Sequence, residues 1–176
     1  MKAVYSWPKI AEECGKDFEE VRRKRMYISN KYLKGIKVIA LDIYGTLIPT
    51  EAPLESTDCE IIIPARRGIE DFFMKCRERK IEVVSASDKE NLWMLKHDIE
   101  ECGIDTANFK KFYCLSETPK NFSEIKQDFK IRGEELLVIG DSFEKDIRGA
   151  MNAGAWYYQV PEYVRDLDDF DISGII

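Results

Sequence analysis

The stretch KVIALDIYGTL, residues 37–47, decides the fold of this chain. Residues 37–41 are mostly apolar and include two β-branched side chains, and the run is too short for a helix, so it predicts a buried strand. The strand ends at Asp42, and a turn that contains Gly45 and Thr46 follows. A carboxylate in this position marks the end of the first strand as the place to look for a site.

Further apolar runs alternate with helical patterns downstream of this strand. Strands are predicted at 81–84, 112–115, 136–139 and 156–160. The helical patterns between them are Ile69, Phe72, Phe73 and Cys76 within 66–80; a helix capped by Asp88 and ended by Gly103; Phe122, Ile125 and Phe129; and residues 143–153, closed by Gly154. This alternation predicts an α/β fold, a three-layer Rossmann-like parallel sheet with helices on both faces, over residues 36–176.

Polar side chains follow several of the predicted strands. Asp42 follows the first, Ser85 follows the second together with the apolar Ala86, Lys120 lies beyond the third, and Asp141 follows the fourth. Ligands of open parallel sheets bind beyond the carboxyl ends of the strands. Two carboxylates, a hydroxyl and an ammonium at one edge can hold a divalent cation and a phosphate together.

Composition and charge exclude several other classes. Hydrophobic residues make up 44% and charged residues 34%, as in ordinary globular proteins. No apolar run approaches the roughly 18 residues that cross a bilayer, and no signal peptide is visible, so we expect a cytoplasmic protein without membrane contact. The net charge of −6 argues against nucleic acid as a general partner.

The cysteines and the single histidine point away from other chemistries. Five scattered cysteines without CxxC spacing predict buried, reduced thiols rather than disulfides or a zinc site. His97 is the only histidine and falls within a predicted helix, which argues against hydrolases that use histidine as the base.

The four segments DIYGTL (42–47), VVSAS (83–87), Lys120 and GDSFEKD (140–146) resemble the ordered motifs of the haloacid dehalogenase superfamily. The resemblance spans about residues 36–160. It implies a Mg²⁺-dependent phosphohydrolase in which Asp42 attacks phosphorus and forms an aspartyl-phosphate. The phosphorylated substrate is then the partner to expect.

The resemblance also assigns roles to individual residues. It implies that Asp42, the Tyr44 carbonyl, Asp141 and Asp146 hold the metal. Thr46, Ser85, Ala86 and Lys120 would bind the phosphate, with Lys120 neutralising charge in the transition state. Asp42 and Tyr44 are the predicted catalytic residues.

One departure from the family pattern leaves alternatives open. Phosphatases of the superfamily usually carry a second aspartate two positions after the nucleophile, and here that position is Tyr44. A tyrosine at this position makes the motif similar to that of the 2-haloacid dehalogenases, in which the aspartate attacks carbon and no metal is needed. Asp141 and Asp146 favour phosphorus chemistry. A third hypothesis is a catalytically weak binding or regulatory module.

Two further segments shape the expected partners. Only the 49–64 loop and the 86–120 unit stand where family members insert a cap domain, so we expect an open site. Such a site suits a macromolecular substrate or one enclosed by a second subunit of a homo-oligomer. Residues 1–35 predict a helical N-terminal extension. Ala11, Gly15 and Val21 are spaced as in a helix-turn-helix, but packing on the core is the favoured interpretation.

Overall fold

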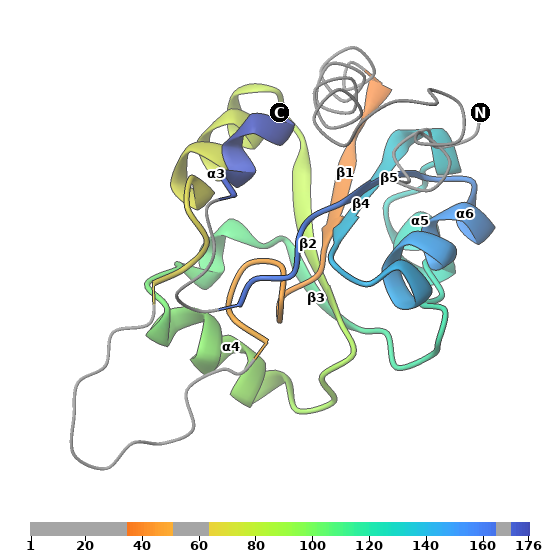
Figure 1. The fold of residues 1–176 in the computed structure, drawn as a ribbon. Helices are drawn as coiled ribbons and strands as arrows, with labels where there is room; N and C mark the ends of the chain where they lie inside the picture. Colours follow the sequence, from red (N-terminus) through yellow and green to blue (C-terminus); the bar gives the residue numbers. More distant parts are fainter. Residues whose placement is uncertain (1–34, 51–63, 165–169) are drawn as a thin grey trace, which may run out of the picture.

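The computed structural model describes residues 35–50, 64–164 and 170–176, which contain one parallel sheet with helices around it (Figure 1). The strands are β1 (Val38–Leu41), β2 (Glu82–Ser87), β3 (Lys111–Cys114), β4 (Leu136–Gly140) and β5 (Trp156–Gln159). Their order is β3-β2-β1-β4-β5, and every neighbouring pair is parallel. The predicted strands are confirmed. The N-terminal extension up to residue 34, with its helix-turn-helix spacing, and residues 51–63 of the predicted loop lie outside the described residues.

Helices cover both faces of the sheet, as predicted. The α-helices are α3 (Ile69–Glu78), α4 (Leu92–Glu101), α5 (Ser123–Asp128) and α6 (Arg148–Ala153), and the short helical segments are η2 (Thr106–Asn108), η3 (Gly133–Glu135), η4 (Phe143–Ile147) and η5 (Ile172–Ile175). Figure 1 shows α3 and α4 on one side of the sheet and α5 and α6 on the other. Right-handed crossovers require this division, because the chain moves outward from β1 to β3 and then returns to β4 and β5.

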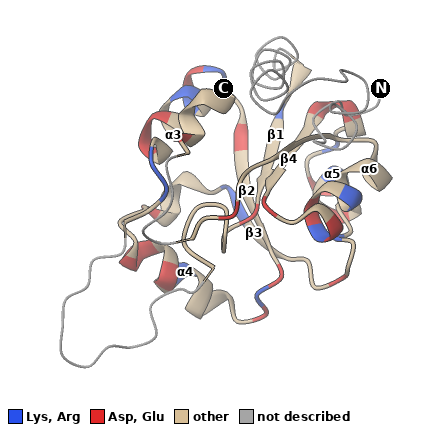
Figure 2. Ribbon diagram, in the orientation of Figure 1, with Lys and Arg blue, Asp and Glu red and all other residues tan. Residues whose placement is uncertain are grey.

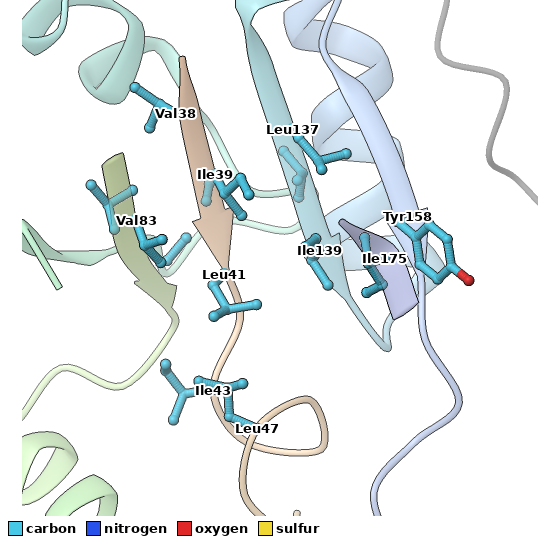
Figure 3. Packing of buried hydrophobic residues seen from close by; sticks show 14 of the residues in the cluster. Val38, Ile39, Leu41, Ile43, Leu47, Val83, Leu137, Ile139, Tyr158 and Ile175 are labelled. Carbon is cyan, nitrogen blue, oxygen red and sulfur yellow. The ribbon is translucent and has the colours of Figure 1, made fainter. Parts of the chain in front are cut away.

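Apolar side chains of the central strands form the core. Every residue of β1 and of β4 is buried, and charged residues gather on the helices and loops rather than on these strands (Figure 2). Figure 3 shows that the packing continues beyond β1 through Ile43 and Leu47, which are 0% exposed. Core packing therefore anchors the loop that follows Asp42.

Two local predictions are wrong, and a third is refined. The side chain of Asn91, not Asp88, caps α4 by accepting a hydrogen bond from the Met94 amide at 3.1 Å. The helix predicted at 143–153 and its end at Gly154 are confirmed, but its first part is the π-helical η4 and the rest is the α-helical α6. Cys114 is exposed at the end of the edge strand β3. Cys76 and Cys102 are buried free thiols, as predicted.

None of the helices in the described ranges combines the length and apolar character needed to cross a bilayer.

Gly149 of α6 sets the distance between this helix and the segment that carries Lys120. A Cβ at Gly149 would lie 2.4 Å from the Lys120 carbonyl oxygen and 2.8 Å from Cε2 of Phe122. We expect Gly149→Ala to lower the free energy of unfolding by about 1–3 kcal/mol, the usual cost of overpacking. Helix propensity alone would instead raise the free energy of unfolding, because it favours alanine over glycine by about 1 kcal/mol.

Denaturant unfolding measures this change. Met151→Ala is the matched control, since Met151 is exposed on the same helix, and it should alter stability by less than about 0.5 kcal/mol. A stabilised Gly149→Ala protein would contradict the close packing of α6 on the Lys120 segment.

Candidate active site

The candidate site lies beyond the carboxyl ends of β1 and β4. The chain leaves β1 to build one half of the sheet and leaves β4 to build the other, so the strand order reverses between these two neighbours. Open α/β sheets bind ligands at this switch point. Asp42 follows β1 directly and Asp141 follows β4 directly. The topology alone therefore brings two carboxylates from distant parts of the sequence together.

Asp42, Asp141 and Asp146 form a cluster in which one oxygen from each carboxylate lies within 4.8 Å of the others. Asp42 is 8% exposed and Asp146 is 1% exposed. Two glycines make room for the cluster. A Cβ at Gly45 would lie 2.8 Å from Oδ2 of Asp141, and a Cβ at Gly140 would lie 2.3 Å from Oδ2 of Asp146. Gly45 also has a φ of +78°, which favours glycine.

Lys120 joins the three other segments of the site. Its Nζ donates to Oδ1 of Asp42 at 2.7 Å, to Oδ1 of Asp146 at 2.6 Å and to the carbonyl oxygen of Ala86 at 2.8 Å. These acceptors use all three protons of the ammonium group. Lys120 is 3% exposed, so its side chain belongs to the interior of the site rather than to the protein surface.

Thr46 connects the two aspartates at the strand ends. Its Oγ1 lies 3.2 Å from Oδ2 of Asp42 and 3.2 Å from Oδ1 of Asp141. The amides of Gly45 and Thr46 donate to the carbonyls of Ile48 and Ile43 within the turn. The hydroxyl of Thr46 thus orients carboxylates, and its predicted contact with a phosphate stays a prediction.

The cluster carries more negative charge than Lys120 compensates. Burial, and then the Asp42 carboxylate, raise the pKa of Asp141 to about 6. The same two causes raise the pKa of Asp146 to about 7, although Lys120 opposes the change. Burial by itself lowers the pKa of Lys120, but attraction to Asp42 and Asp146 outweighs burial and raises it. An additional cation would remove this imbalance.

The donor set fits Mg²⁺. Carboxylate oxygens are the ligands that Mg²⁺ prefers, and oxygens on opposite sides of an octahedral ion lie about 4 Å apart. The three carboxylates therefore need only small shifts to reach one ion. The Oδ2 of Asp146 already accepts the Ser142 amide at 3.2 Å, which fixes its orientation as a ligand.

Ser85 is the strongest candidate for a contact to a bound anion. It lies in β2, directly opposite Leu41 of β1 in the sheet register, and is fully buried. Its Oγ is a buried polar atom without a hydrogen-bond partner in the described part of the chain. A buried hydroxyl without a partner costs about 1–3 kcal/mol, so a ligand oxygen here would be stabilised. Neighbouring Ala86 contributes its carbonyl to Lys120.

Tyr44 points its phenol toward α4. The hydroxyl donates a hydrogen bond to Oδ2 of Asp98, and Nζ of Lys89 lies 5.5 Å from the centre of the ring. Burial, followed by the hydrogen bond to Asp98, raises the pKa of Tyr44 above its ordinary value. The catalytic role predicted for Tyr44 stays a prediction, and so does the metal contact of its carbonyl.

Several residues at the site were not found from the sequence. Asp98 holds Tyr44, and Lys145 forms an ion pair with Asp88 at 2.6 Å between η4 and the end of β2. Asp88 follows a predicted strand and Lys145 lies near the end of the GDSFEKD segment. Because parallel strands end at one edge of the sheet, their proximity could have been inferred from the predicted topology. Asp98 directly precedes the buried Ile99 of α4, but its partner Tyr44 lies 54 positions away, and no local pattern indicates that contact.

Replacing Asp141 by asparagine should stabilise the protein when no metal is bound. The folded pKa of about 6 lies above the value of about 3.9 in an unfolded chain, so ionising Asp141 costs folding free energy. This cost appears as pH rises from about 4 to 6. We expect Asp141→Asn, studied calorimetrically with EDTA, to gain about 1–2 kcal/mol at pH 7.5 and little at pH 4.5.

Asp128→Asn is the control with the opposite sign. Hydrogen bonds from Lys111 and then Tyr113 lower the pKa of Asp128, so its ionised form is the stabilising one, and removing that charge should reduce stability at pH 7.5. We also expect added Mg²⁺ to raise the melting temperature of the wild type and to leave that of Asp141→Asn unchanged. A destabilised Asp141→Asn protein at pH 7.5 would refute the charge imbalance.

Comparison with known proteins gives a family match and a set of similar folds. A HAD-hydrolase-like family model matches residues 118–168, which contain Lys120, Asp141 and Asp146. No curated protein matches the sequence at a significant level. Among solved structures, a haloacid dehalogenase-like family hydrolase from Xanthomonas campestris has a TM-score of 0.59 and 13% identity, covering 78% of this chain and 88% of its own.

Two further structures share the fold. CbbY from Rhodobacter sphaeroides, in complex with phosphate, has a TM-score of 0.56 and 16% identity over 77% of this chain and 90% of its own. YfnB from Bacillus subtilis, bound to magnesium, has a TM-score of 0.54 and 13% identity over 69% of this chain and 85% of its own. The family match supports the resemblance for the segment that carries Lys120, Asp141 and Asp146, and the solved structures share the fold of the chain.

Proposed function

We propose that the chain is a Mg²⁺-dependent phosphohydrolase that acts through an aspartyl-phosphate on Asp42. The observation that carries the proposal is the cluster of Asp42, Asp141 and Asp146, in which the ammonium of Lys120 pairs with Asp42 and Asp146. The unpartnered hydroxyl of Ser85 at the same edge of the sheet supports it. Together these groups can bind a phosphate dianion and present a carboxylate oxygen to its phosphorus.

In the first step an oxygen of Asp42 attacks phosphorus, the Asp42–phosphorus bond forms, and the bond to the leaving oxygen breaks. In the second step water attacks the phosphorus of the aspartyl-phosphate and releases inorganic phosphate and the free carboxylate. Lys120 fixes the position of Asp42 through its 2.7 Å hydrogen bond and offsets negative charge on the phosphoryl group. The hydroxyl of Ser85 would donate a hydrogen bond to a phosphoryl oxygen.

Asp42, Asp141, Asp146 and the Tyr44 carbonyl would hold Mg²⁺, which supplies positive charge between two anionic reactants. The phosphate in the CbbY structure and the magnesium in the YfnB structure support this assignment through the shared fold. A phosphorylated substrate is the expected partner. Its size, its enclosure by a second subunit and the cytoplasmic location stay predictions from the sequence.

We expect turnover of p-nitrophenyl phosphate that depends on added Mg²⁺, is abolished by EDTA and falls to background in Asp42→Asn. Asp128→Asn, which removes a surface carboxylate away from the cluster, should keep wild-type turnover. Release of p-nitrophenolate is followed spectrophotometrically. Metal-independent turnover, or an active Asp42→Asn protein, would contradict the proposal. Chloride release from 2-chloropropionate without metal would favour the dehalogenase hypothesis instead.

A second measurement addresses proton supply to the leaving group. The phenol of Tyr44 donates to Asp98, and burial together with that bond raises its pKa, so it is a weak acid whose proton is already engaged. We expect Tyr44→Phe to keep kcat within about threefold for both aryl and alkyl phosphates, well short of the 10²–10⁴-fold typical of a lost general acid. A loss confined to alkyl phosphates would instead assign the proton to Tyr44.

A further inference from the structure

Arg66 is a buried cation outside the four motifs. It precedes α3 and is 1% exposed. Its Nη1 donates to the carbonyl oxygen of Thr46 at 3.1 Å, and its Nη2 donates to the carbonyl oxygen of Pro161 at 2.6 Å. One guanidinium group therefore joins the loop after the nucleophile to the segment after β5, which is 95 positions further along the chain than Arg66.

In the loop after Asp42, the residue that Arg66 contacts also contacts the carboxylates. Arg66 holds the carbonyl of Thr46, and the hydroxyl of Thr46 lies 3.2 Å from both Asp42 and Asp141. The backbone amide of Arg66 also donates to the carbonyl of Leu47 at 2.7 Å. Two hydrogen bonds from one residue thus hold the carbonyls of the consecutive turn residues Thr46 and Leu47.

The other side of the contact involves aromatic residues near the end of the sequence. The guanidinium carbon lies 5.4 Å from the ring centre of Tyr163 and 5.0 Å from that of Phe170. Both distances are within the range of cation–π attraction. The amide of Tyr163 donates to the carbonyl of Gly45 at 2.7 Å. The segment that contacts Arg66 therefore also contacts the nucleophile loop directly.

We infer that Arg66 is a positioning residue for the metal-binding carboxylates, an inference that rests on the proposed function. By fixing Thr46, Arg66 holds the hydroxyl that keeps Asp42 and Asp141 at chelating distance. The role needs the planar fork of arginine, which reaches two carbonyls at once while its face lies against aromatic rings. A lysine at this position could satisfy one carbonyl but could not reproduce the fork or the stacking.

The test compares Arg66→Met and Arg66→Lys with Lys75→Met. Lys75 is the matched control, because its Nζ donates to the carbonyls of Ser173 and Ile176, a few residues beyond Phe170, and has no hydrogen bond to Thr46 among these contacts. Titration calorimetry with Mg²⁺ alone gives the affinity of each folded protein. Hydrogen exchange of metal-free protein reports the opening of residues 43–48, and turnover of p-nitrophenyl phosphate separates kcat from KM.

We expect Arg66→Met to raise the Mg²⁺ dissociation constant about tenfold, the lower end of the effect seen when partners of metal ligands are removed. Exchange of the 43–48 amides should accelerate, and Arg66→Lys should recover part of both changes. Turnover should fall through kcat at limiting Mg²⁺ and recover at saturating Mg²⁺. Lys75→Met should lower the melting temperature and leave Mg²⁺ affinity and loop exchange unchanged.

Equal loss of stability in Arg66→Met and Lys75→Met, with Mg²⁺ affinity and loop exchange unchanged in both, would overturn the inference. Loop exchange is measured without metal or substrate, so the inference is tested even if the wild type hydrolyses nothing. Absence of turnover in a wild-type protein that binds Mg²⁺ would count against the proposed function alone. If Arg66→Met does not fold, Arg66→Lys carries the same comparison.

Discussion

The ammonium of Lys120, held between the carboxylates of Asp42 and Asp146, is the interaction on which the rest of the site depends. A buried charge costs several kcal/mol unless oppositely charged and hydrogen-bonding groups surround it. Lys120 meets that condition with two carboxylates and the carbonyl of Ala86. Each acceptor comes from a different segment: the end of β1, the π-helical η4 and the end of β2. The pairing therefore ties together segments that the sheet brings only approximately into position.

This pairing leaves an excess of negative charge in the carboxylate cluster. Three carboxylates lie close together and one ammonium group pairs with two of them, so burial and the Asp42 charge raise the pKa values of Asp141 and Asp146. A fold selected for stability alone would have replaced one of these acids by a neutral side chain. Strain of this kind is common at functional sites, where affinity for a ligand depends on interactions that the free protein leaves unsatisfied. The unpartnered hydroxyl of Ser85 has the same character.

Position at strand ends made Asp42, Ser85 and Asp141 predictable, because parallel strands finish at one edge of the sheet. Lys120 was predicted from its position just ahead of a helix and 21 residues before Asp141, and the structure distinguishes it from the exposed Lys111 by burial. Contacts of long side chains were not predictable. The partner of Tyr44 or of Arg66 depends on how α4 and the C-terminal segment pack, which no periodicity encodes. The edge position of β3, which exposes Cys114, likewise follows from strand order rather than from local sequence.

The contacts of Arg66 with Pro161, Tyr163 and Phe170 bear on how the protein acquires its site during synthesis. The ribosome makes Asp42 early and these three residues much later. Contacts over such separations form slowly, because the intervening chain must be ordered before they can stabilise anything. A nascent chain that already displays Asp42 therefore lacks the groups that fix its loop. On this account, a fully formed carboxylate cluster is a late product of folding, and an incomplete chain carries Asp42 without the contacts that fix its loop.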